Sequence, residues 1–284
     1  MATNRSSAFA AVKPLSRRAM LLGLAMLAAP ACDVTGLARG ATVERQPTDF
    51  FLFFDRSISI GDKSNQRWIE QDVPALLAEL APGDWMAGYG VHGETATAEP
   101  FMKVDLGAPT ASSMTEQLRS QAQKRQAISD AVAKLKSFLS GPKAKQTDLY
   151  GAFTRVGGPR TGRRKVIVFF SDMLESVPGE VDFEKVPLTP ERNRILVTEL
   201  LRRHGWTKEM FSGVEFRCYL ESAEDAERGP GKTASRNTAR PNGHEALHAF
   251  WRLLIEGSLG GHLNHFENAP YRKPEAPAGA GKSS

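Results

Sequence analysis

Residues 50–59 read FFLFFDRSIS, five apolar residues followed by an aspartate and then by two serines at alternate positions. The apolar run is rich in aromatic residues and too short for the core of a helix, so it predicts a strand that is buried on both faces. In open α/β sheets, ligands bind beyond the carboxyl ends of the strands. Asp55, Ser57 and Ser59 are therefore expected at the binding edge, where their oxygen atoms suit a hard divalent cation such as Mg²⁺ better than zinc.

Two later segments bring further polar groups to the same expected edge. Residues 164–172 read RKVIVFFSD, again a buried strand that leads to an acid. Residues 146–153 read QTDLYGAF, which puts a threonine where a short helix should start. That threonine either caps the helix or directs its hydroxyl group to the metal. The candidate metal ligands are then Asp55, Ser57, Ser59, Thr147 and Asp172.

The order Asp-x-Ser-x-Ser, then a threonine that opens a helix, then an aspartate that ends a strand resembles the metal-ion-dependent adhesion site of von Willebrand factor A (VWA) domains. The resemblance extends over residues 49–266, because the order of the expected strands and helices also fits. It implies that the three hydroxyl groups bind Mg²⁺, or Mn²⁺ or Ca²⁺, and that the two aspartates supply charge, often through water. It also implies non-enzymatic binding of a protein partner, whose acidic side chain completes the metal coordination.

Hydrophobic periodicity predicts an α/β fold around these motifs. Helices are expected over residues 66–80, 112–139, 190–203 and 243–256, and further strands over residues 85–91, 100–106, 214–220 and 262–266. The helix over 190–203 is expected to turn four residues inward: Ile195, Leu196, Leu200 and Leu201. The connection between residues 91 and 100 is too short for a crossover helix, so these two strands should form an antiparallel hairpin. We therefore expect a doubly wound, mostly parallel sheet of about six strands with one antiparallel edge strand, VWA- or Rossmann-like.

Both ends of the chain are expected to lie outside this domain. Residues 1–31 join a basic region to an apolar stretch that is too short for a permanent membrane span, which is typical of an export signal. The pair Arg17-Arg18 resembles a twin-arginine signal, and a general secretory signal is the alternative. Residues 32–47 are expected to be a linker, residues 48–267 the domain, and residues 268–284 a disordered tail.

Cys32 follows Ala-Pro-Ala, as at a lipoprotein processing site. A lipid on Cys32 would be the only attachment to a membrane, and the expected location is the periplasm or cell envelope. The alternative is ordinary cleavage after residues 38–40, which discards Cys32. Four basic residues in the signal carry all but one of the chain's formal +5 charges. A nucleic-acid partner is therefore not expected.

Residues 244–248 read HEALH and match the His-Glu-x-x-His motif of zinc proteases. The alternative function is therefore a zinc metallohydrolase that uses His244, Glu245 and His248. The context disfavours it, because residues 241–243 read PNG and put His244 in the first turn of a helix rather than in its interior. A third ligand at a family-specific spacing is also missing. We expect a binding protein with no catalytic residues, and a third interpretation is a scaffold whose metal site is only structural.

Overall fold

A computed structural model describes residues 45–107, 113–157, 162–183, 185–221 and 243–268. The chain divides after Glu44 into two units, and the described residues all belong to the second. The expected export signal, Cys32 and most of the expected tail lie outside the described residues. In the part of the chain that is described, no helix is both long and apolar enough to cross a membrane.

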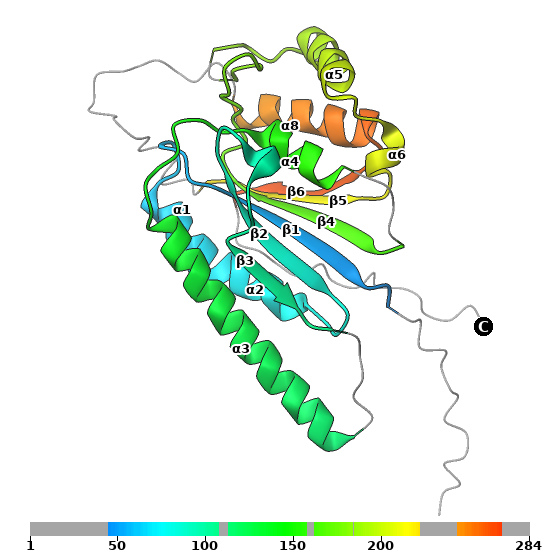
Figure 1. Ribbon diagram of the computed structural model, residues 1–284. Helices are drawn as coiled ribbons and strands as arrows, with labels where there is room; N and C mark the ends of the chain where they lie inside the picture. The colour runs from blue at the N-terminus through cyan, green and yellow to red at the C-terminus, as the bar shows by residue number, and fades with distance from the viewer. Residues whose placement is uncertain (1–44, 108–112, 158–161, 184, 222–242, 269–284) are drawn as a thin grey trace, which may run out of the picture. The chain divides into compact units, whose positions relative to one another are not determined.

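Six strands form one sheet in the order β3-β2-β1-β4-β5-β6 (Figure 1). The strands are β1 (Thr48–Asp55), β2 (Trp85–Val91), β3 (Met102–Asp105), β4 (Arg164–Phe170), β5 (Glu215–Tyr219) and β6 (His262–Glu267). All neighbours are parallel except β2 and β3, which are antiparallel. This confirms the predicted α/β fold, with a mostly parallel sheet of six strands and one antiparallel edge strand.

Helices cover both faces of the sheet (Figure 1). On one face lie α1 (Asp62–Arg67), the π-helix η1 (Trp68–Asp72), α2 (Val73–Glu79) and α3 (Met114–Leu139). On the other face lie α4 (Leu149–Val156), α5 (Pro190–His204), α6 (Lys208–Phe211), α8 (His244–Arg252) and the π-helix η3 (Leu253–Ser258). A short 3-10 helix, η2 (Thr95–Thr97), follows β2.

Strand β1 runs through the middle of the core, as its aromatic sequence predicts. Phe50, Leu52 and Phe54 pack in the apolar cluster under α1, α2 and α3. Phe53 points to the other face and joins the cluster under α4, α5 and α8. The alternation of a strand thus distributes one apolar run between two hydrophobic cores.

One predicted core position is wrong. Ile195 is 66% exposed, whereas Val197 is buried. The buried residues of α5 are Asn193, Leu196, Val197 and Leu200, which follow the spacing of three and four of a single helical stripe. The first buried position of this stripe is the polar Asn193. A search for apolar residues alone does not include Asn193, and it therefore assigns Ile195 to the buried face in error.

Candidate metal site

Asp55 lies at the carboxyl end of β1 and is completely buried. Its Oδ1 accepts a hydrogen bond from the backbone N–H of Ser57 at 2.7 Å. Its Oδ2 accepts one from the hydroxyl of Ser171 at 2.8 Å. Ser171 is within reach because Phe54 pairs with Phe170 across β1 and β4, so both strands end at the same level. The carboxylate is thus fixed at the centre of the sheet's carboxyl edge.

The two serines of the motif converge. The hydroxyl oxygens of Ser57 and Ser59 lie 2.7 Å apart and form a hydrogen bond. Ser57 also forms an isolated parallel bridge with Ala144, whose N–H donates to the carbonyl of Arg56 at 2.9 Å. The loop that leads to Thr147 therefore lies alongside the Asp-x-Ser-x-Ser segment.

Thr147 is not the cap of α4. Asp148 is the N-cap, since its Oδ1 accepts a hydrogen bond from the N–H of Gly151 at 2.6 Å. Thr147 is 3% exposed, and its backbone N–H and carbonyl both bond to Ser176, in the loop after β4. Of the two roles that the sequence left open for Thr147, capping is wrong. A role toward a metal remains a prediction.

Asp172 follows β4 and is 5% exposed. Its Oδ1 accepts a hydrogen bond from the N–H of Leu174 at 3.2 Å. Between them, Met173 has a φ of 60°, and it is the only non-glycine residue with positive φ in the described part of the chain. The hydroxyl of Ser171 accepts from the N–H of Met173, and the indole of Trp251 donates to its carbonyl. Such strain costs about 1–3 kcal/mol and clusters at functional sites. Here it turns the chain directly after Asp172.

Glu175 is a structural link that the sequence did not single out. Its side chain is completely buried, and it accepts four hydrogen bonds from backbone N–H groups. Oε2 accepts from Leu149 and Tyr150, at the start of α4, and Oε1 accepts from Ser176 and Val177, in its own loop. Burial raises the pKa of Glu175 to about 8. Glu175 therefore joins the helix after Thr147 to the loop after Asp172.

The two site aspartates oppose each other electrostatically. Burial, together with the nearby charge of Asp172, raises the pKa of Asp55 to about 7, although hydrogen bonds from Ser57 and Ser171 act in the opposite direction. Within the described ranges, no lysine, arginine or histidine forms an ion pair with Asp55. A divalent cation would remove this repulsion, and two carboxylates among hydroxyl groups form an all-oxygen donor set that fits Mg²⁺. The residues present therefore fit the metal that the sequence predicts.

The histidine motif does not form a comparable site. His244 is the first residue of α8, as predicted, and the ring of His248 stacks on Phe266 at 4.9 Å. Among the residues that the structure describes, no group of three or more His, Cys, Asp or Glu side chains is arranged to hold a metal ion. Nothing here therefore supports a zinc hydrolase. The candidate site at Asp55 is of another kind, since it combines only two carboxylates with hydroxyl groups.

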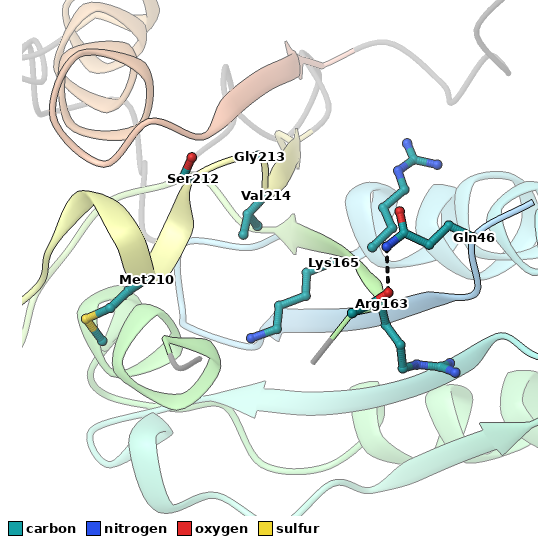
Figure 2. Close-up of a pocket in the computed structure, with 9 residues that line it drawn as sticks. Gln46, Arg163, Lys165, Met210, Ser212, Gly213 and Val214 are labelled. Atoms are coloured by element: carbon teal, nitrogen blue, oxygen red, sulfur yellow. Dashed lines mark hydrogen bonds between the residues drawn. The ribbon is translucent and has the colours of Figure 1, made fainter. Parts of the chain in front are cut away.

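A pocket of about 300 Å³ lies at the opposite edge of the sheet, where the strands begin (Figure 2). Arg163 in this pocket bonds to Asp49, and Arg164 pairs with Glu215. The third cation, Lys165, donates to the carbonyl of Val156 at 3.2 Å. These charges already have partners within the protein. The pocket also lies away from the edge at which α/β sheets bind ligands, so it is not the favoured site.

A scan against protein-family models gave no match, and neither did a search of curated proteins. Among solved structures, the chain is similar to the conserved hypothetical protein BatB from Bacteroides thetaiotaomicron, with 13% identity and a TM-score of 0.39 over 78% of this chain and 91% of that one. It is also similar to the manganese-loaded TRAP protein of Plasmodium vivax, with 17% identity and a TM-score of 0.29 over 74% of each chain. For proximal thread matrix protein 1 from the mussel byssus, the identity is 13% and the TM-score 0.33, over 74% of this chain and 48% of that one. These scores are low, so the fold assignment rests on the strand order and directions given above.

Proposed function

We propose that this chain is an exported bacterial protein whose VWA-like domain binds a protein partner in a divalent-metal-dependent, non-enzymatic manner. The proposal depends above all on the buried carboxylate of Asp55, which has the charge of Asp172 beside it and no ion pair within the described residues. The strand order supports the proposal as well, because it brings the Asp-x-Ser-x-Ser segment and Asp172 to one edge.

In this proposal the hydroxyl groups of Ser57, Ser59 and Thr147 hold Mg²⁺, and Asp55 and Asp172 neutralise its charge. Mg²⁺ keeps several of its waters and accepts carboxylate ligands, so it offers a coordination position to an acidic side chain of the partner. Two carboxylates against a divalent cation leave the site neutral. A third carboxylate, supplied by the partner, is therefore not strongly repelled.

The experiment is thermal unfolding of wild type and Asp55→Ala with and without Mg²⁺, beside capture of partners from envelope extract in Mg²⁺ or chelator. At one hundred times its dissociation constant, Mg²⁺ should stabilise wild type by about 2.7 kcal/mol. Asp55→Ala should lose this gain and the capture. Asp49→Ala is the matched control, because it removes a carboxylate from the other end of the same strand. If wild type gains nothing from Mg²⁺ and Asp55→Ala still captures its partner, the proposal is wrong.

For the location, we propose that residues 1–31 are removed on export and that a lipid on Cys32 anchors the mature chain. Mass spectrometry of the membrane fraction should detect a lipid-modified Cys32. A soluble chain that begins near residue 41 would exclude the anchor and leave export standing. Unchanged export after Arg17 and Arg18 are replaced by lysine would exclude the twin-arginine route.

A further inference from the structure

Ile58 is exposed in the middle of the candidate metal motif. Its side chain is 57% exposed. Its neighbours Ser57 and Ser59 turn their hydroxyl groups toward each other, so Ile58 lies between two candidate ligands without being one. A single exposed apolar residue is ordinary on a protein surface. This one, however, lies directly between two of the candidate metal ligands, Ser57 and Ser59.

The loop beside this motif is basic. The bridge between Ser57 and Ala144 holds residues 141–146 against the motif. The ammonium group of Lys143 donates to the carbonyl of Ile60 at 2.7 Å, so this cation contacts the backbone two residues after Ile58. Lys143 is exposed, and so is Lys145, next to Ala144. The motif therefore has two lysines along one side.

Exposed acids around the motif offset only part of this charge. Asp62 and Lys63, at the start of α1, are both exposed, and their opposite charges offset each other. Gly93 lies against Gln146, which brings the exposed Glu94 near the same loop. With Asp55 and Asp172 neutralised by a divalent cation, the described residues named here leave three exposed lysines, Lys63, Lys143 and Lys145, against two exposed acids, Asp62 and Glu94.

We infer that the partner presents an acidic segment in which the metal-binding carboxylate stands next to a bulky apolar side chain. This inference rests on the proposed function, since the carboxylate needs the metal. Ile58 contacts the apolar side chain, and the two lysines attract the acidic residues that flank it. Covering the exposed part of an isoleucine with another apolar side chain favours binding by about tenfold.

The test uses the mature protein and a phage library of nonapeptides with a fixed central glutamate and randomised neighbours. The phages bind in the presence of Mg²⁺ and are then eluted with a chelator. Wild type should enrich leucine, isoleucine or phenylalanine next to the glutamate by about tenfold over glycine. Ile58→Ser should remove this preference and still retain chelator-eluted peptides, whereas Ile58→Val should keep it. Replacing Lys143 and Lys145 by glutamate should remove enrichment of acids at the outer positions and leave the apolar preference.

The outcomes separate the two proposals. The inference is overturned if the chelator-eluted peptides show no apolar enrichment, or if Ile58→Ser gives the same enrichment as wild type. Either result leaves the proposed function intact. If nothing is eluted by chelator and Mg²⁺ does not raise the melting temperature of wild type, the proposed function itself fails. Melting curves of every variant without Mg²⁺ show whether a loss of binding reflects a loss of folding.

Discussion

The acids at the two edges of the sheet differ in what neutralises them. At the edge where the parallel strands begin, three acids each have an arginine partner: Asp49 with Arg163, Asp84 with Arg45, and Glu215 with Arg164. At the edge where the strands end, Asp55 is bonded to an N–H group and a hydroxyl and lies near the charge of Asp172. Acids of the first kind hold the fold together. Asp55 instead lies beside a second carboxylate, and in the proposed function a cation compensates the repulsion between them.

The largest effect is expected in the sheet centre, which belongs to neither edge. Phe53 is completely buried and stacks on Tyr89 and Phe169, both at a centroid distance of 5.4 Å. Phe53→Ala should destabilise the domain by about 3–5 kcal/mol, because it opens a cavity in the core. Urea denaturation should give the same loss with and without Mg²⁺. A loss that depends on Mg²⁺ would show that the core and the metal edge are coupled.

At the paired edge, Asp84→Asn should cost about 1–3 kcal/mol. Asp84 accepts hydrogen bonds from the side chain of Arg45 and from the backbone N–H groups of Thr48 and Ala81. An amide keeps one acceptor oxygen and leaves part of this set without a partner. The same denaturation experiment measures the cost, which should not respond to Mg²⁺. Stabilisation by this change would contradict the contrast between the edges.

At the other edge, stability should depend on pH. Burial raises the folded-state pKa of Asp55 from 3.8 to about 7 and that of Glu175 from 4.5 to about 8. Between about pH 4 and 8 the folded domain thus binds more protons than the unfolded chain, so these groups make stability fall as pH rises. Without Mg²⁺, the melting temperature should be lower at pH 8 than at pH 5, and Mg²⁺ should reduce the loss.

Asp55→Asn is the control for this pH profile. It removes one titrating group, so it should flatten the profile and, in chelator at pH 8, melt above wild type. The same aspartate-to-asparagine change then has opposite signs at the two edges. A profile that rises toward pH 8 and is unaffected by Asp55→Asn would contradict the repulsion between Asp55 and Asp172.

The smallest effect on the fold is expected at Thr147. Because Asp148 caps α4, Thr147→Ala should change the free energy of unfolding by less than about 1 kcal/mol. Its stabilisation by Mg²⁺ should nevertheless weaken. Asp148→Ala should show the reverse, a loss of about 1 kcal/mol with the helix cap. Equal effects of both variants on the fold and on the Mg²⁺ response would mean that the two residues do not have separate roles.

The fold was predictable because the runs at 50–54 and 164–170 carry unmistakable strand patterns, and because a short connection forces the hairpin of β2 and β3. The closeness of Asp55 and Asp172 was predictable for the same reason, since parallel strands bring their carboxyl ends to one edge. The cap of α4 was not, because Thr147 and Asp148 are adjacent and both residue types cap helices well. Only the three-dimensional path of the chain decides between them.

Glu175 could not be identified from the sequence. It is one of several acids in the loop after β4, and its role depends on bonds to α4 that no local pattern encodes. One general signal exists: the first N–H groups of a buried helix need acceptors from outside the helix. By this rule the first N–H groups of α4 need acceptors, and Asp148 accepts from only one of them, Gly151. A second acceptor could therefore be expected, but the sequence does not say which residue provides it.

Glu175 also has a consequence for how this part of the molecule opens. The amide protons of Leu149, Tyr150 and Val177 are all directed at this one side chain. Any local opening that withdraws the Glu175 side chain releases all three at once, so they should exchange with deuterated solvent at a common rate, whereas the N–H of Ser176 keeps its bond to the carbonyl of Thr147. The first turn of α4 and the loop after Asp172 are then one cooperative unit, although the sequence separates them by a whole strand.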